Sequence, residues 1–248
     1  MNNKIFKKFC GILGYRIIDK NLFRNKRLIS TYSVQNIKNF LSKLFIENKI
    51  NNIVQIGAND GVIFDDLNEF INRYEIQSLL VEPIKDNFDK LKEKYINSNF
   101  VTLENSAIFN STKDLFLYKV EKKYLHYYDV HIPGITSLDK NHLLNHGVKL
   151  KHIVKESVNT ITIIGLLNKY NIKNLDLLYI DAEGYDGNIV LDFLSHSILK
   201  PIIIFEYIHV QNEVLNKVIL KINNDYKIFS LNENLVCIPK IKNISISY

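Results

Sequence analysis

Two hydrophobic patterns recur along the chain. Uninterrupted apolar runs occur in NIVQI (52–56), SLLVEP (78–83), LDLLYIDAEG (175–184) and PIIIFEYI (201–208). Between them lie segments with apolar residues three and four positions apart, such as KDNFDKLKEKYI (85–96), which is typical of amphipathic helices. Apolar runs without alternation indicate strands covered on both faces. Strand–helix alternation therefore predicts an α/β protein with a doubly wound, mostly parallel sheet.

The remaining segments complete this prediction. Further helices are expected at 33–50 with Ser33 as N-cap, and near 64–73, 162–171, 186–199 and 212–223. Another strand is expected within NFVTLENSAI (99–108), and an exposed antiparallel one at 114–120. YKIFSL and LVCIPK, joined by NEN, predict a terminal hairpin. We expect a basic helical appendage at 1–45 and one domain at 46–248.

Composition narrows the class of protein. A hydrophobic content of 46% is enough for a full core, and no apolar run approaches the ~20 residues that span a bilayer. Cys10 and Cys237 are too few for a disulfide framework or a zinc cluster. The basic start lacks a small-residue cleavage site, so a signal peptide is not expected. A cytoplasmic setting fits these features.

Charge is concentrated at the N-terminus. Residues 1–27 carry eight basic side chains and one acid, whereas the rest of the chain sums to about −1 of a total of +6. A uniform nucleic-acid face is therefore disfavoured, and no nucleic-acid partner is expected. Ile5, Phe9, Ile12 and Leu13 have helical spacing. This basic amphipathic segment either packs on the domain or contacts an anionic membrane at its inner face.

The first strand runs into a glycine turn, Gly57-Ala58-Asn59-Asp60-Gly61. Ligands of such sheets bind beyond the carboxyl ends of the strands, and glycine lets a backbone approach closely. The spacing is G-x-x-x-G and not the G-x-G-x-x-G of dinucleotide sites. Taken alone, it fits a cofactor loop or a plain turn. No P-loop lysine follows, so a nucleoside triphosphate is not expected.

Acidic residues follow two of the strands. Glu82 ends the second strand, where an acid accepts the ribose hydroxyls of a nucleoside. Asp181 and Glu183 follow a buried strand, and burial of such acids is costly unless they bind something. The alternative is a helix N-cap, a task for which Asp186 is placed.

Together these motifs resemble the FkbM family of S-adenosylmethionine-dependent methyltransferases. The resemblance rests on VQIGANDG, LLVEP, NTITIIGLLNKYNIKNLDLLYIDAEGYDGNIVLDF and PIIIFEYIH, in that order. It implies a Rossmann-like class I fold with a seven-stranded sheet and a terminal antiparallel hairpin. It also implies S-adenosylmethionine as methyl donor and O-methylation of a sugar or natural-product hydroxyl.

The resemblance also assigns residues. It implies that Gly57, Ala58, Asn59 and Gly61 line the methionine and ribose part of the donor. Glu82 would hold the ribose hydroxyls, Ser106 and Ala107 would lie near the adenine, and Asp181 would face the methyl-transfer centre. Gln55 stands where family members often carry an acid. Its amide still accepts a hydrogen bond from the donor's ammonium group, without charge assistance.

O-methylation benefits from a general base near the acceptor hydroxyl. The candidates are Asp181, Glu183 and His209, with Glu206 in an otherwise apolar strand as a further acid. Asp181, Glu183 and Glu206 together are also suited to hold a divalent cation through oxygens. The sequence does not decide this point, and no metal is predicted.

The segment 124–152 holds five of the seven histidines together with Tyr124, Tyr127 and Tyr128. Aromatic and hydrogen-bonding side chains suit a carbohydrate site. Residues 121–150 are therefore predicted to form a substrate-side wall, with a plain surface insertion as the alternative. His142 and His146 have zinc-ligand spacing but lack the glutamate of H-E-x-x-H, so a zinc site is not expected.

The sequence disfavours three other functions. A nicotinamide-dependent oxidoreductase requires the absent G-x-G-x-x-G turn. A non-catalytic binding or scaffold protein predicts loss of the glycines or of Glu82, and both are present. Methylation of exocyclic amines usually shows an (N/D)PP(Y/F) signature, which is missing. The favoured function is O-methyl transfer to a glycan or small-molecule acceptor, with the sugar assignment resting on family analogy.

Overall fold

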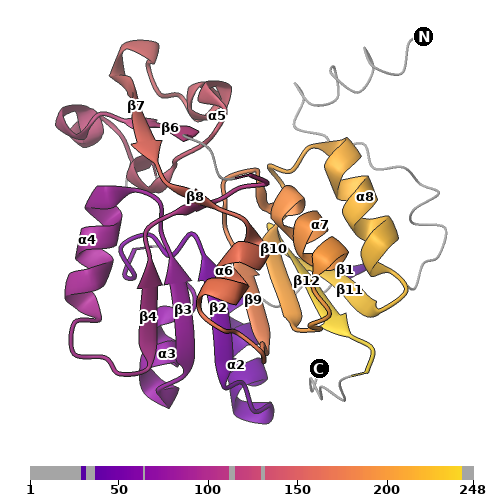
Figure 1. Ribbon diagram of the computed structural model, residues 1–248. Helices are drawn as coiled ribbons and strands as arrows, with labels where there is room; N and C mark the ends of the chain where they lie inside the picture. Colours follow the sequence, from indigo (N-terminus) through magenta and orange to yellow (C-terminus); the bar gives the residue numbers. More distant parts are fainter. Residues whose placement is uncertain (1–28, 32–36, 64, 112–114, 130–131, 242–248) are drawn as a thin grey trace, which may run out of the picture.

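The computed structural model describes residues 29–31, 37–63, 65–111, 115–129 and 132–241 (Figure 1). Its frame is an eight-stranded sheet in the order β1-β11-β12-β10-β9-β2-β3-β4. The strands are β1 (Ile29–Thr31), β2 (Asn52–Ile56), β3 (Gln77–Val81), β4 (Val101–Glu104), β9 (Leu177–Ile180), β10 (Ile202–Glu206), β11 (Tyr226–Leu231) and β12 (Asn234–Pro239). All neighbours are parallel except β12, which is antiparallel to both β10 and β11. The seven predicted strands are confirmed, and β1 adds an eighth at the edge.

Helices cover both faces of this sheet. They are α2 (Ile37–Glu47), α3 (Asn68–Tyr74) and α4 (Lys85–Lys94) on one face, and α6 (Ile163–Lys169), α7 (Asp186–His196) and α8 (Asn212–Ile222) on the other. Figure 1 shows α6, α7 and α8 in front of the sheet and α2 and α3 behind it. Successive strand residues point to opposite faces, so Ile53 joins the core beneath α2–α4 and Val54 joins the core beneath α6–α8. This explains the uninterrupted apolar runs and confirms the doubly wound prediction.

One helix begins later than its pattern indicates. The sequence predicts a helix from about residue 64, whereas α3 begins at Asn68. The Oδ1 atom of Asp60 accepts hydrogen bonds from the amides of Val62 and Ile63, and Asp65 does the same for Leu67 and Asn68. These short-range hydrogen bonds stabilise turns instead of a helix. The carboxylates accept from backbone amides that would otherwise donate to carbonyl oxygens within a helix.

A separate small lobe follows β4. β6 (Leu115–Val120) pairs antiparallel with β7 (Ile153–Val158), which confirms the predicted exposed antiparallel strand. The chain enters and leaves through β5 (Ala107–Ile108) and β8 (Thr160–Ile161), which pair with each other. Between β6 and β7 lie η1 (Lys122–Tyr127), η2 (Ile132–Gly134), α5 (Lys140–Asn145) and η3 (Leu150–His152). The lobe has its own core of Val120, Ile132, Ile135, Leu143 and Val148.

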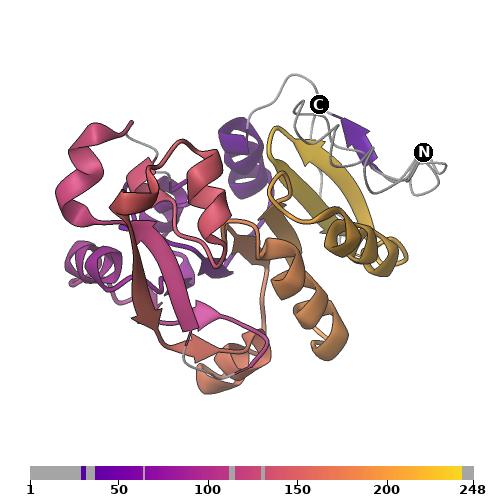
Figure 2. The ribbon, with the colours of Figure 1, turned by 90° about the horizontal axis from the view of Figure 1, so that it is seen from above.

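The lobe lies at one end of the main sheet. In Figure 1 it is at the top, with β6, β7 and α5 beyond the ends of β2, β3 and β4. Seen from above, it covers the part of the molecule built early in the sequence, while α7, α8 and the terminal hairpin lie to the other side (Figure 2). The predicted insertion at 121–150 is thus the distal part of a lobe that spans β6 to β7.

The N-terminal predictions fall mostly beyond the described part of the chain. The basic segment 1–27 and Ser33 lie outside the described residues. Helix α2 crosses residue 45 and buries Phe40, Leu41 and Leu44 beneath the sheet. Within the described residues, no helix combines the length and apolar character needed to cross a bilayer.

Candidate active site

A cavity of about 520 Å³ opens at the carboxyl ends of β2, β3, β9 and β10. β2 and β9 are neighbours, and the chain continues from them in opposite directions across the sheet, toward β3 and toward β10. The cavity therefore lies at the switch in strand order, where ligands of open α/β sheets bind. The lobe closes it from above through residues 134–138 and His146.

Gly57 sets the geometry of the first turn. Its φ is +82°, and a Cβ at this position would lie 1.8 Å from the backbone oxygen of Asp181. The amide of Asp181 donates to the oxygen of Ile56 at 2.9 Å. Only glycine allows β2 to turn while its end remains paired with β9. The turn thus brings the two strand ends together at the cavity.

Asn59 and Glu82 connect the first two strand ends. Asn59 has a φ of +50°, and its amide donates to Glu82 Oε2 at 3.0 Å. The amide of Ile84 donates to Glu82 Oε1 at 2.8 Å. Burial raises the pKa of Glu82 to about 7, although these two bonds favour the ionised form. Each carboxylate oxygen has two lone pairs, so Glu82 keeps acceptor capacity for a ligand in the cavity.

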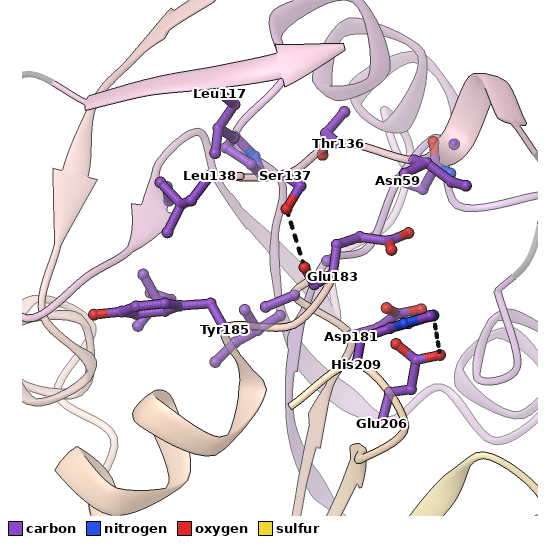
Figure 3. A pocket seen from close by; sticks show the side chains of 18 of the residues that line it. Asn59, Leu117, Thr136, Ser137, Leu138, Asp181, Glu183, Tyr185, Glu206 and His209 are labelled. Carbon is purple, nitrogen blue, oxygen red and sulfur yellow. Dashed lines mark hydrogen bonds and ion pairs between the residues drawn. The ribbon is translucent and has the colours of Figure 1, made fainter. Parts of the chain in front are cut away.

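Carboxyl groups crowd the opposite wall (Figure 3). Burial raises the pKa of Asp181 well above its ordinary value, and the charges of Glu183 and Asp186 raise it further. Burial, together with the charge of Asp181, raises the pKa of Glu206 to about 9. Among the described residues, no group hydrogen-bonds the buried Oε2 of Glu206. Such a wall favours a cationic ligand, because a positive charge relieves the repulsion between the carboxylates.

Asp186 does not cap the following helix, as the alternative interpretation of these acids supposed. Helix α7 begins at Asp186 itself, Tyr185 is its N-cap, and no side chain caps it, so the N-cap interpretation is wrong. The fully buried carboxylate instead accepts from the amides of Ala182 and Gly184, each at 3.0 Å. Burial raises its pKa to about 7. Asp186 therefore fixes the loop that carries Asp181 and Glu183.

Histidines lie on the rim of the same wall. Glu183 Oε2 is 3.0 Å from His142 Nε2, and the backbone oxygen of Glu183 accepts from Ser137 Oγ at 3.2 Å. His209 Nε2 lies 3.7 Å from Glu206 Oε1. The lobe and the β9–α7 loop are thus joined through Glu183.

The comparisons with known proteins agree with this geometry. A sequence profile of the methyltransferase FkbM domain matches residues 55–228. The chain belongs to the FkbM methyltransferase family. A solved structure of a methyltransferase FkbM from Methylobacillus flagellatus superposes with a TM-score of 0.53 at 12% identity, over 94% of this chain and 70% of that one.

Other comparisons are more distant. A dimethyladenosine transferase from Plasmodium falciparum superposes with a TM-score of 0.42 at 9% identity, over 86% of this chain and 63% of that one. No curated protein matches the chain significantly in sequence. The family and the fold therefore rest on the FkbM profile and on the first superposition.

In this FkbM methyltransferase, most of the predicted site residues come together. The cavity is lined by Gly57, Asn59, Glu82, Ser106, Ala107, Asp181, Glu183, Glu206 and His209. Ser106 directs its hydroxyl inward, to Glu104 Oε1 at 2.5 Å. The hydroxyl hydrogen of Ser106 is therefore already donated, and its oxygen can act toward a ligand only as an acceptor.

Three predicted donor-binding residues of the FkbM chain lie outside the lining. Gln55 is buried and donates from Nε2 to Asp65 Oδ1 at 3.1 Å. Ala58 is part of the core beneath α2–α4. Gly61 packs on α4, where a Cβ would lie 2.6 Å from Leu91 Cδ1. Their contact with a methyl donor stays a prediction.

The FkbM site also contains residues that sequence reasoning did not assign to it. Ser137 and His142 contact Glu183 from the lobe, and Asn87 lines the cavity beside Glu82. The spacing of His142 and His146 is a signal in the sequence that these two side chains lie close together. Nothing in the sequence indicated that Glu183 and His209 lie beside them, because the contacts join distant segments.

Proposed function

We propose that the chain transfers a methyl group from S-adenosylmethionine to a hydroxyl of a sugar or glycan. The observation that carries this proposal is that one cavity holds both Glu82, on one wall, and the acids of the other wall, Asp181, Glu183 and Glu206. The first wall suits the hydroxyl groups of a ribose, and the second suits a cation.

The residues present fit this methyl donor. Beside its hydrogen bonds from Asn59, Ile84 and Asn87, the Glu82 carboxylate keeps acceptor capacity for a ribose hydroxyl. The sulfonium and ammonium groups of the donor are positive, and the acidic wall supplies the complementary charge. Asn59 presents its backbone amide to Glu82 and thereby holds this carboxylate toward the cavity.

The bound donor supplies an electrophilic methyl group, whose bond to sulfur breaks as a bond to the acceptor oxygen forms, with the electron pair staying on sulfur. The residues of the chain position the acceptor and take its proton. Burial and the neighbouring carboxylates raise the pKa of Asp181, which favours its protonated form in the free protein. A cation beside it lowers that pKa and prepares the carboxylate to accept the hydroxyl proton. Glu183 and His209 lie on the same wall as further bases.

The lobe supports a carbohydrate acceptor. It contributes residues 134–138 to the cavity. It also carries an aromatic group in which the rings of Tyr124 and His152 stack at 3.9 Å and the ring of Tyr127 lies 5.8 Å from that of His152. Tyr127 is 66% exposed. None of these three rings lines the cavity, so they would pack only against the part of a longer glycan that extends beyond it.

Labelled methyl transfer tests the proposal. Full-length protein with methyl-labelled S-adenosylmethionine is offered nucleotide sugars, glycan fragments and small hydroxylated compounds, and products are identified by mass spectrometry. We expect a methyl ether. Asp181→Asn should lower kcat about 100-fold as a lost base, while Asp89→Asn on the exposed face of α4 leaves it unchanged. A methyl group found on nitrogen or carbon, or no product from any hydroxyl acceptor, would overturn the O-methyl assignment.

A further inference from the structure

Three histidines from two separate parts of the chain meet at the rim of the cavity. His142 lies in α5, His146 follows that helix as its C-cap, and His209 lies between β10 and α8. Their ring centroids are 4.6 Å (His142 to His209), 4.7 Å (His142 to His146) and 5.4 Å (His146 to His209) apart. One potential ligand nitrogen from each ring lies within 4.8 Å of those of the other two.

This spacing is close to that of a three-histidine metal centre. Zinc–nitrogen bonds of about 2.0–2.1 Å in a tetrahedral site put the ligand nitrogens about 3.3 Å apart. The nitrogens would have to approach one another by up to about 1.5 Å, which side-chain rotation can supply. All three rings are partly buried, so the site is shaped by the protein and remains accessible to an ion.

Carboxylates stand behind two of the three rings. Glu183 Oε2 lies 3.0 Å from His142 Nε2, and Glu206 Oε1 lies 3.7 Å from His209 Nε2. A carboxylate at one ring nitrogen orients the imidazole and fixes the tautomer that leaves the other nitrogen available to a metal. Glu183 is within hydrogen-bond distance of His142 and can orient its ring in this way, whereas Glu206 is too far from His209 for a direct hydrogen bond.

We infer that His142, His146 and His209 bind a divalent transition-metal ion of the zinc class, with Glu183 orienting His142 and Glu206 lying beside His209. Imidazole donors select zinc or cobalt over magnesium, which prefers oxygen. Three protein ligands leave a fourth position, as in catalytic zinc sites. His146 and His209 both line the cavity, so that position lies at its wall.

The ion has two consequences. It ties the lobe to the main domain, because two ligands come from α5 and its end and the third follows β10. It would also acidify a hydroxyl bound at its open position and so ease removal of the acceptor proton. With the ion bound, His209 is a ligand, and the proton goes to a carboxylate of the acidic wall instead. This second role rests on the proposed methyl transfer, whereas metal binding does not.

The test uses full-length protein without a histidine tag, freed of metal with a chelator. Cobalt is titrated in while its visible absorption is recorded, and zinc binding is measured by calorimetry. We expect a tetrahedral cobalt spectrum, one zinc ion per chain and a higher melting temperature with zinc. His146→Gln and His209→Gln should each weaken zinc binding by about 100-fold or more. The matched control is His196→Gln, on α7 beside Asp192 and away from the cluster, which should bind zinc as the parent does.

Two results would overturn the inference. One is the absence of a tetrahedral cobalt spectrum in the unsubstituted protein, a readout that does not depend on any variant folding. The other is zinc binding of equal strength in the parent and in folded His146→Gln and His209→Gln proteins. S-adenosylmethionine binding to the same metal-free sample separates the two proposals. Donor binding without a metal site overturns only the metal inference, and metal binding without donor binding overturns only the transferase.

Discussion

The backbone oxygen of Asp181 occupies the space that a side chain at Gly57 would need. A Cβ there would be 1.8 Å from that oxygen, whereas a Cβ at Gly147 would meet nothing within 4 Å. Both glycines have nearly the same left-handed backbone, with φ of +82° and +81°. The pair therefore separates the cost of the backbone conformation from the cost of the contact.

Gly57→Ala should destabilise the protein far more than Gly147→Ala. The second change carries only the backbone cost of about 1 kcal/mol, while the first adds a collision worth about 2 kcal/mol or more. Denaturant unfolding of both variants measures the difference. Equal loss of stability in the two would show that β2 and β9 do not approach each other as described.

Glu82→Gln should weaken S-adenosylmethionine and S-adenosylhomocysteine equally. Both carry the same ribose, and loss of a charged hydrogen-bond acceptor costs about 1.5–3 kcal/mol, or about 10- to 100-fold in Kd. Glu93→Gln, on the exposed side of α4, is the control. A Glu82→Gln protein that is folded and binds both compounds normally would remove Glu82 from the donor site.

Proton release should distinguish the methyl donor from its product. Burial raises the pKa values of both Asp181 and Glu206, and a pKa of about 9 means that Glu206 holds its proton at pH 7 in the free protein. The sulfonium charge lowers these pKa values, so S-adenosylmethionine binding releases protons and tightens as the pH rises toward about 9. The thioether product lacks that charge and should release fewer protons. Calorimetry in buffers of different ionisation enthalpy measures the number released, and equal numbers for both ligands would contradict the acidic wall as the sulfonium site.

The stability of the ligand-free protein should fall as the pH rises. A carboxyl group whose folded pKa is raised binds more protons in the folded state than in the unfolded one. For Glu206, the stabilising effect is fully present below its ordinary pKa near 4.5 and is lost as the pH rises through about 9. Glu206→Gln mimics the protonated form and should be more stable than the parent at pH 9 by about 1 kcal/mol or more, with little difference at pH 5. Parallel pH profiles of the two melting temperatures would show that Glu206 is not buried in this way.

The sequence predicts the sheet well because its signal is local. Each central strand carries an apolar run that only two-sided burial explains, as Ile53 and Val54 illustrate. Among the elements that escaped prediction, β1 and β7 show why. β1 is three residues long and is defined by its pairing with the distant β11, whereas β7 mixes Lys155 and Glu156 into an exposed strand. Neither shows a pattern before its partner is known.

The sequence predicts those site residues whose positions follow from the order of the strands alone. Glu82 and Asp181 end strands that both flank β2, so their meeting follows from the strand order. Backbone dihedrals decide which turn residues face the cavity, and for this reason Asn59 lines it while Ala58 and Gly61 do not. The contact between His142 and Glu183 depends on how the lobe folds back, which the sequence does not encode locally.

Calorimetric titration of full-length protein with S-adenosylmethionine, and then with S-adenosylhomocysteine, tests the central claim most directly. We expect both to bind at one molecule per chain with a Kd of about 1–100 μM, the range in which enzymes commonly hold their substrates. A correctly folded protein that binds neither compound at about 1 mM would contradict the assignment of this cavity as a methyl-donor site.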